Sequence, residues 1–118
     1  MTQDTIQDLI VAKGKTAPRI TPADVEAAIA GEHYFTASQG VIGARGTVTF
    51  GSPLMLLTFC VLELENGFTV TGESSCVSPE NFDAEIGRKV ARQNAINKVW
   101  PLLGYALREQ LHNEGKKA

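Results

Sequence analysis

The N-terminal part of the chain shows the hydrophobic spacing of helices. Apolar residues recur three to four positions apart within residues 2–13, which predicts a short amphipathic helix. A second helix is expected after a basic linker, because Thr21 can cap it, Pro22 suits its first position and Asp24 complements its positive end. Its apolar stripe should continue until Gly31 ends the helix.

Residues 37–53 interrupt this pattern because glycine recurs through them. A flexible, turn-rich loop is predicted there, with one short strand at Thr47–Phe50. Arg45 lies between two glycines and would be exposed in such a loop. The sequence GVIGARG does not match a Walker-type phosphate loop, so a plain loop is favoured, although Arg45 and free backbone amides could meet an anion.

Two runs rich in β-forming residues flank Asn66-Gly67, the pair preferred in a two-residue type I′ turn. That turn predicts a hairpin in which Cys60 faces Glu73. Cys76 would then lie on the opposite face from Cys60, so a disulfide between them is not expected.

A long helix is predicted to begin near Phe82, with Asn81 as its cap and Asp83 near its positive end. Phe82, Ile86 and Val90 form an apolar stripe that should cover the hairpin, unless a partner subunit does so.

The C-terminal part of this helix is expected to break at Pro101, which either kinks it or opens a second helix. The tail, residues 113–118, should fray. The predicted fold class is α+β in a single domain, residues 1–118: two short N-terminal helices, a small antiparallel sheet with a central hairpin, and two C-terminal helices.

The composition narrows the function classes. The chain has 118 residues, 43% of them hydrophobic, which suffices for the core of one domain. Its net charge of −2 disfavours DNA or RNA binding, which usually needs a basic excess. No run has the length of a membrane span and the N-terminus lacks a signal-peptide pattern, so a cytoplasmic protein without membrane attachment is expected.

The chemically reactive residues do not have the spacing of a catalytic or metal site. Cys76 lies near a helix start, but the sequence places neither His33 nor His112 beside it, and a buried, unreactive cysteine is favoured. Asp83 and Glu85 diverge on a helix and are better explained as complements of the helix dipole. We therefore expect no metal, no cofactor and no enzymatic activity.

The joint between hairpin and helix is the most suggestive binding feature. Helix N-termini offer unpaired N–H groups that bind phosphates. Phe82 could stack on a base, and Arg88 and Arg92 are four positions apart and could neutralise phosphates. Asn94 lies on or beside the apolar stripe and should have a hydrogen-bond partner. A capped helix with a core phenylalanine and solvated arginines remains the alternative, and from these residues alone it is favoured.

Residues 66–109 read NGFTVTGESSCVSPENFDAEIGRKVARQNAINKVWPLLGYALRE. This run resembles the phage Gp49-like family of small phage and prophage proteins, in a pattern with NGF, TG, NF, EIG, NA and GY at fixed places. A looser match, ITPADVEAAI, precedes it. The first type of Thoeris anti-defence (Tad) sponge looks like members of this family.

The resemblance implies a protein that sequesters cyclic nucleotide immune signals without cleaving them. The implied ligands are cyclic ADP-ribose isomers and, in some members, cyclic oligonucleotides. It also implies a dimer-based homo-oligomer, up to a hexamer, that holds ligands between subunits in the cytoplasm of an infected bacterial cell. The residues carried over as ligand-binding candidates are Asn81, Phe82, Arg88, Asn94 and Arg108.

Two arginines outside the matching run complete the candidate set. The segment Ser38–Pro53 is longer and richer in glycine than the family pattern suggests, and Arg45 could serve a pocket there. Arg19 could line a second anionic site near a symmetry axis. Two other functions stay open: inhibition of a host or defence protein by direct contact, and thiol chemistry at Cys76.

Overall fold

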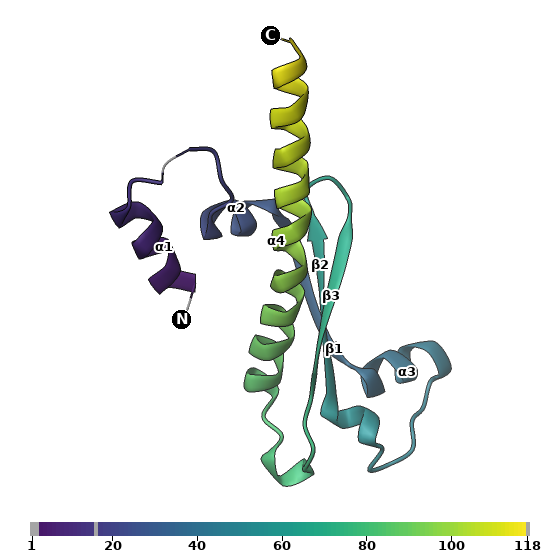
Figure 1. The fold of residues 1–118 in the computed structure, drawn as a ribbon. Helices are drawn as coiled ribbons and strands as arrows, with labels where there is room; N and C mark the ends of the chain where they lie inside the picture. Colours follow the sequence, from purple (N-terminus) through teal and green to yellow (C-terminus); the bar gives the residue numbers. More distant parts are fainter. Residues whose placement is uncertain (1–2, 16, 118) are drawn as a thin grey trace. The chain divides into compact units, whose positions relative to one another are not determined.

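The computed structural model describes residues 3–15 and 17–117. Its helices and strands, in chain order, are α1 (Gln3–Ala12), α2 (Pro22–Ala28), β1 (Ile29–Thr36), α3 (Ala37–Arg45), the 3-10 helix η1 (Pro53–Leu56), β2 (Leu57–Leu64), β3 (Thr69–Ser75), the 3-10 helix η2 (Pro79–Asn81) and α4 (Ala84–Lys117) (Figure 1). The predicted α+β fold class is confirmed. The chain separates into two compact units, one formed by Ile29–Lys98 and the other by the residues up to Ala28 together with those from Val99 onward.

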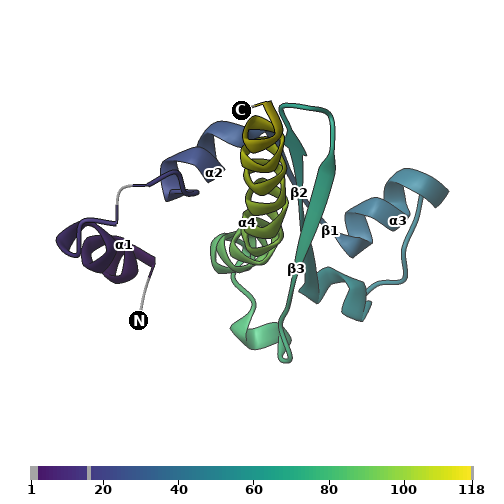
Figure 2. The ribbon, with the colours of Figure 1, turned by 45° about the horizontal axis from the view of Figure 1, so that its top comes forward.

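The unit Ile29–Lys98 is built on a three-stranded antiparallel sheet with β2 in its centre (Figure 2). Cys60 of β2 pairs with Tyr34 of β1 on one side and with Gly72 of β3 on the other. The even-numbered residues of β2 are buried and the odd-numbered ones are not, as expected for a strand with one covered face. The first part of α4 covers the buried face.

The contact between α4 and this face is unusually close because the residues in it are small. A Cβ atom added to Gly72 would lie 2.2 Å from the Ala91 carbonyl oxygen and 2.3 Å from the Ala95 nitrogen. Ala91 and Ala95 are themselves fully buried. The backbone of the helix therefore rests directly on the backbone of β3.

The hairpin is confirmed, but its turn and register differ from the prediction. The Leu64 amide donates to the Phe68 carbonyl at 2.8 Å and the Gly67 amide donates to the Leu64 carbonyl at 2.9 Å. Gly67 has a φ of 89°, so this is a three-residue loop closed by a left-handed glycine. The extra loop residue shifts the register by one, so Cys60 faces Gly72 and not Glu73 as predicted.

The cysteines are free, as predicted, but for a different reason. The corrected register gives Cys76 the same side of the sheet as Cys60, contrary to the prediction. Cys76 lies four positions beyond Gly72, the partner of Cys60, which corresponds to about 13 Å along a strand. That separation is well outside the reach of a disulfide.

Residues 29–53 depart most from the sequence prediction. Strand β1 occupies the place where the second helix was expected to continue to Gly31, and α3 replaces most of the predicted loop. Thr47–Phe50 is not a strand. A capping box starts α3: the Gln39 amide donates to Thr36 Oγ1 at 3.2 Å, and the Thr36 amide donates to Gln39 Oε1 at 2.9 Å. These two bonds favour a helix despite its internal glycines.

Helices α1 and α2 confirm the two predicted N-terminal helices. Thr21 and Asp24 cap α2 reciprocally, with the Asp24 amide donating to Thr21 Oγ1 at 3.2 Å and the Thr21 amide donating to Asp24 Oδ2 at 2.9 Å. The bond from the Thr21 amide is the main reason that the pKa of Asp24 lies below its usual value.

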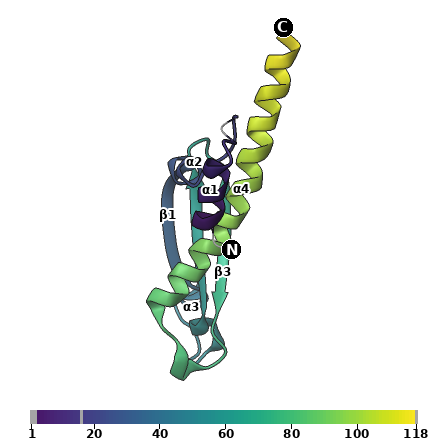
Figure 3. The same ribbon diagram turned by 60° about the vertical axis from the view of Figure 1, so that its left-hand side comes forward.

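The C-terminal region is one helix instead of two. Helix α4 continues through Pro101 to Lys117 and is drawn as one continuous helix in Figure 3, so the prediction of a second C-terminal helix is wrong. None of the described helices combines the length and the apolar character that a bilayer crossing requires.

The start of α4 also differs from the prediction. Its cap is Asp83, whose Oδ1 accepts the Ile86 amide at 3.0 Å, whereas Asn81 belongs to η2. The predicted core stripe is wrong as well, because Ile86 and Val90 are 62% and 43% exposed. The buried side of the helix is the small-residue side that includes Ala91.

Candidate ligand-binding site

A pocket of about 340 Å³ lies beside the first turns of α4, within the unit Ile29–Lys98. The residues that line it are Tyr34, Phe35 and Thr36 of β1, Gln39 of α3, Thr58 of β2, and Phe82, Ala84 and Arg88 at the start of α4. We call it the Phe82–Arg88 pocket. Its size falls within the range of small-molecule sites, roughly 300–1,000 Å³.

The β1–α3 corner forms a fixed wall of this pocket. Thr36 is both the last residue of β1 and the N-cap of α3. Gln39 therefore lies beside the end of β1. The Thr36 hydroxyl also bonds the buried Ser38 hydroxyl at 2.9 Å. The ring of Phe35, itself a lining residue, packs against the ring of Phe59 with centroids 5.6 Å apart. The wall is therefore held by both hydrogen bonds and aromatic packing.

A second pocket, of about 270 Å³, lies on the other flank of the same helix turns. Its lining residues are Leu56, Thr58, Ser74, Ser75, Cys76, Asn81, Phe82, Asp83, Ile86, Gly87 and Val90. Phe82 and Thr58 line both pockets. A Cβ atom on Gly87 would lie 3.0 Å from Thr58 Oγ1, so helix and strand touch between the two pockets.

The N-terminus of α4 is not an open phosphate site. The carboxylate of Asp83 accepts an amide that a phosphate would otherwise use, and it adds negative charge at the positive end of the helix. The hypothesis of phosphate binding at this N-terminus is therefore not favoured. Arg88 is the cationic residue in the lining of the Phe82–Arg88 pocket.

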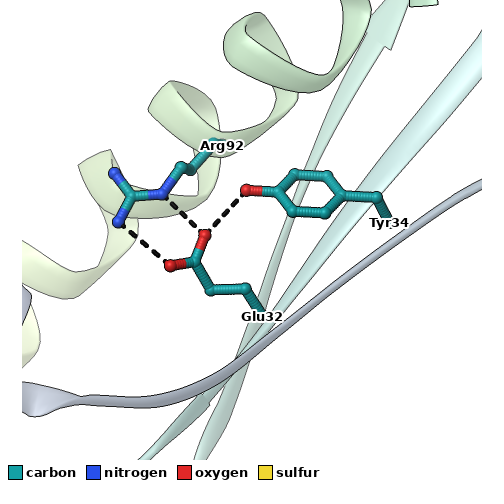
Figure 4. A network of polar contacts seen from close by, with 3 residues as sticks. All are labelled: Glu32, Tyr34 and Arg92. Carbon is teal, nitrogen blue, oxygen red and sulfur yellow. Dashed lines mark hydrogen bonds and ion pairs between the residues drawn. The ribbon is translucent and has the colours of Figure 1, made fainter. Parts of the chain in front are cut away.

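A hydrogen-bonded network links α4 to β1 beside the pocket (Figure 4). Glu32 Oε1 accepts from Arg92 Nε at 2.7 Å and from the Tyr34 hydroxyl at 2.7 Å, and Glu32 Oε2 accepts from Arg92 Nη2 at 3.3 Å. The hydrogen bond from Arg92, then that from Tyr34, lowers the pKa of Glu32. Partial burial and the bond to Glu32 raise the pKa of Tyr34 above its usual value, so its hydroxyl stays protonated as a donor.

A family model matches the part of the chain that contains both pockets. Residues 20–111 match the model of the Phage protein (N4 Gp49/phage Sf6 gene 66) family. The chain belongs to this family. No curated protein and no solved structure matches the chain. Every residue that lines the two pockets of this phage protein lies within the matched residues.

The structure brings together three of the residues predicted to bind a ligand. Phe82 and Arg88 line the same pocket, and Asn81 joins Phe82 in the second one. The expectation that Asn94 has a partner is confirmed, since its Nδ2 donates to the Glu73 carbonyl at 2.8 Å and ties α4 to β3. The sequence suggested that Arg92 could neutralise a phosphate, whereas in this phage protein Arg92 pairs with Glu32.

The other three candidate arginines lie elsewhere. Arg45 ends α3 and lines a separate cavity with residues 47–49, and Arg19 donates to the Gln7 side chain. Arg108 is exposed on α4 in the other unit. The pocket residues that sequence reasoning missed are mainly those of the β1–α3 corner. The sequence does contain one indication of this corner: Thr36 and Gln39 have the spacing of a capping box, which predicts the start of a helix.

The reactive side chains are not arranged as a nucleophile and its base. The Cys76 thiol donates to the Ser78 carbonyl at 3.2 Å, and no histidine is among the residues lining either pocket. His33 is bonded instead to Glu63. Within residues 3–15 and 17–117, no three His, Cys, Asp or Glu side chains gather where they could hold a metal ion.

Proposed function

We propose that this phage protein binds a cyclic nucleotide immune signal and sequesters it without cleaving it. The ligands would be cyclic ADP-ribose isomers or cyclic oligonucleotides, taken up in the cytoplasm of an infected bacterial cell. The observation that carries the proposal is the Phe82–Arg88 pocket, which joins an aromatic ring, a cation and polar side chains in one cavity.

Each part of a nucleotide has a matching group in this pocket. Phe82 offers a ring on which a base can stack, a contact worth roughly 1–3 kcal/mol. Arg88 offers a guanidinium group that can bind a phosphate through two parallel hydrogen bonds. Gln39 uses its carbonyl oxygen in the capping box, which leaves its NH₂ group to donate to a base or ribose.

The lining of the two pockets supports binding rather than hydrolysis. Cys76 is the strongest nucleophile of the second pocket, and the residues around it include no histidine that could act as its base. The carboxylate of Asp83 is engaged in capping α4. A site of this kind can hold a ligand by stacking and charge without activating water or a thiol.

Exposed apolar side chains support a homo-oligomer as the working form. Val77 is 96% exposed, and Ile86 and Val90 are exposed on α4. Exposed apolar side chains that gather into a patch commonly mark a site of protein contact, and Ile86 and Val90 both line the second pocket. A dimer-based assembly would cover these residues.

Calorimetric titration with a nucleotide panel tests the proposal. The panel contains cyclic ADP-ribose isomers, cyclic di- and trinucleotides, ADP-ribose and NAD. Wild-type protein should bind at least one cyclic member, and Phe82→Ala and Arg88→Ala should each abolish that binding while the fold survives.

Two matched variants control for nonspecific effects. Phe68→Ala removes an exposed phenylalanine at the hairpin, and Lys89→Ala removes a cation next to Arg88 that pairs with Glu85. Both should bind like wild type. Retained affinity in Phe82→Ala and Arg88→Ala would contradict the assignment of the pocket.

A second candidate function is inhibition of a host or defence protein by direct contact. The observation that favours it is the same exposure of Ile86 and Val90, which a foreign partner could cover. Absence of heat with every nucleotide, together with recovery of one defined host protein that Ile86→Glu no longer retains, would support this function instead.

A further inference from the structure

Glu32 is not among the residues lining the Phe82–Arg88 pocket, but it touches one that is. Its carboxylate accepts the Tyr34 hydroxyl at 2.7 Å, and Tyr34 is a lining residue. Arg92 reaches both carboxylate oxygens from α4, at 2.7 and 3.3 Å (Figure 4). The ring of Tyr34 therefore connects the Glu32–Arg92 ion pair to the pocket.

The position of Tyr34 explains why its ring needs such an anchor. Strand β1 is at an edge of the sheet, so Tyr34 has a neighbouring strand on one side only. A side chain at an edge can exchange between staggered rotamers unless packing or a hydrogen bond selects one. Glu32 lies two residues earlier on the same face, and Arg92 fixes its carboxylate from the helix.

We propose that Glu32 is a positioning residue for the ligand site. With Arg92 it holds the ring of Tyr34 as a wall of the Phe82–Arg88 pocket, so that the pocket keeps the shape that accepts a nucleotide ring. This inference rests on the proposed function, because the ligand whose binding it supports is the cyclic nucleotide.

Affinity measurements on two variants test the role directly. Glycosidically linked cyclic ADP-ribose is titrated into wild type, Glu32→Ala and Tyr34→Phe. Each variant removes the bond between hydroxyl and carboxylate, and each should weaken binding by about fivefold, the effect of losing one hydrogen bond. Glu32→Gln keeps an acceptor oxygen for the hydroxyl and should recover most of the affinity.

The same sheet provides a control for the loss of a glutamate contact. Glu63 of β2 pairs with His33 of β1, on the other face of the sheet and away from the pocket lining. Glu63→Ala therefore removes a glutamate contact of this sheet without touching Tyr34. Its affinity for the cyclic ADP-ribose isomer should equal that of wild type.

Fluorine NMR measures the environment of Tyr34 in the folded protein, separately from any general loss of stability. The chain has two tyrosines, so 3-fluorotyrosine labelling gives two resonances, and Tyr105→Phe assigns the remaining one to Tyr34. Glu32→Ala should shift the Tyr34 resonance toward that of free 3-fluorotyrosine, whereas Glu63→Ala should leave it in place. Addition of the cyclic ADP-ribose isomer should also shift it in the wild type.

The outcomes separate this inference from the proposed function. Wild-type binding that is unchanged in Glu32→Ala and Tyr34→Phe overturns the positioning role and leaves the proposed function standing. A Tyr34 resonance that does not respond to Glu32→Ala also overturns it. Failure of the wild type to bind any cyclic member of the nucleotide panel overturns both.

Discussion

The two ends of the contact between α4 and the sheet differ in how much space they leave. At Gly72 the strand and the helix touch through their backbones, and a single added Cβ atom would lie 2.2 Å from the Ala91 carbonyl oxygen. One to two turns earlier, beside Arg88, the same helix leaves a pocket of about 340 Å³. The comparison shows that tight packing at one end can set the position of the walls at the other.

This arrangement separates stability from binding. Small residues such as Ala91 fix the distance between helix and sheet, while Phe82 lines the space that this distance leaves. Changes at the tight end should unfold the protein and lose the pocket with it. Changes at the open end should remove ligand affinity and leave the fold intact.

The largest expected effect is that of Gly72→Ala. The new methyl group has no space, so we expect destabilisation by about 3 kcal/mol or more. Urea unfolding at neutral pH would measure it as a lower midpoint. Gly43→Ala is the control, because a Cβ atom there meets nothing within 4 Å and the change should be neutral or slightly stabilising in α3. A wild-type midpoint for Gly72→Ala would contradict the tight contact.

The next effect is confined to binding. Phe82→Leu keeps apolar volume but removes the ring, so affinity for the cyclic nucleotide should fall by roughly tenfold or more with little change in stability. Isothermal titration beside urea unfolding measures both. Phe68→Leu, the same change at an exposed phenylalanine of the hairpin, should leave affinity unchanged. If Phe82→Leu lowers the unfolding midpoint as strongly as Gly72→Ala does, stability and binding are not separable here.

A smaller effect distinguishes the two possible caps of α4. Asp83→Ala should destabilise the protein by about 1 kcal/mol, because its carboxylate accepts the Ile86 amide. Asn81→Ala should have no comparable effect, since Asn81 belongs to the preceding 3-10 helix. Urea unfolding measures both variants, and an equal loss of unfolding free energy in the two would argue against Asp83 as the cap.

The smallest effect concerns pH. The folded state lowers the pKa of Glu32, so this group contributes stability above the ordinary glutamate pKa and loses that contribution as the pH falls through the lowered value. The difference in unfolding free energy between wild type and Glu32→Gln should therefore shrink on acidification from pH 7 towards 3. Unfolding series at several pH values measure it, and a constant difference would contradict the role of the ion pair.

Much of the fold could be predicted because its signals are local. The cap of α2 at Thr21, the strands on either side of Asn66-Gly67 and the start of a helix near Phe82 all depend on neighbouring residues. The same helix start led us to name Phe82 and Arg88 as ligand-binding candidates, and both line one pocket. These features needed no knowledge of distant contacts.

The features that could not be predicted depend on contacts between distant parts of the chain. Strand β1 is stabilised by its pairing with β2, whose residues lie about thirty positions away, so its own sequence gives a weak signal. The buried side of α4 was missed because hydrophobic counting favours Ile86 and Val90, whereas a close approach to Gly72 requires alanine. The pocket corner at Thr36 was hidden by the glycines that suggested a loop.

Recovery of the bound nucleotide tests the central claim most directly. Wild-type protein is incubated with glycosidically linked cyclic ADP-ribose, separated from free nucleotide and heated to denature it, and the released compound is identified by mass spectrometry. Sequestration predicts that the intact cyclic compound is recovered in proportion to the protein, and that Arg88→Ala retains none. Recovery of a linear or hydrolysed product, or of no nucleotide from the wild type with any cyclic member of the panel, would contradict it.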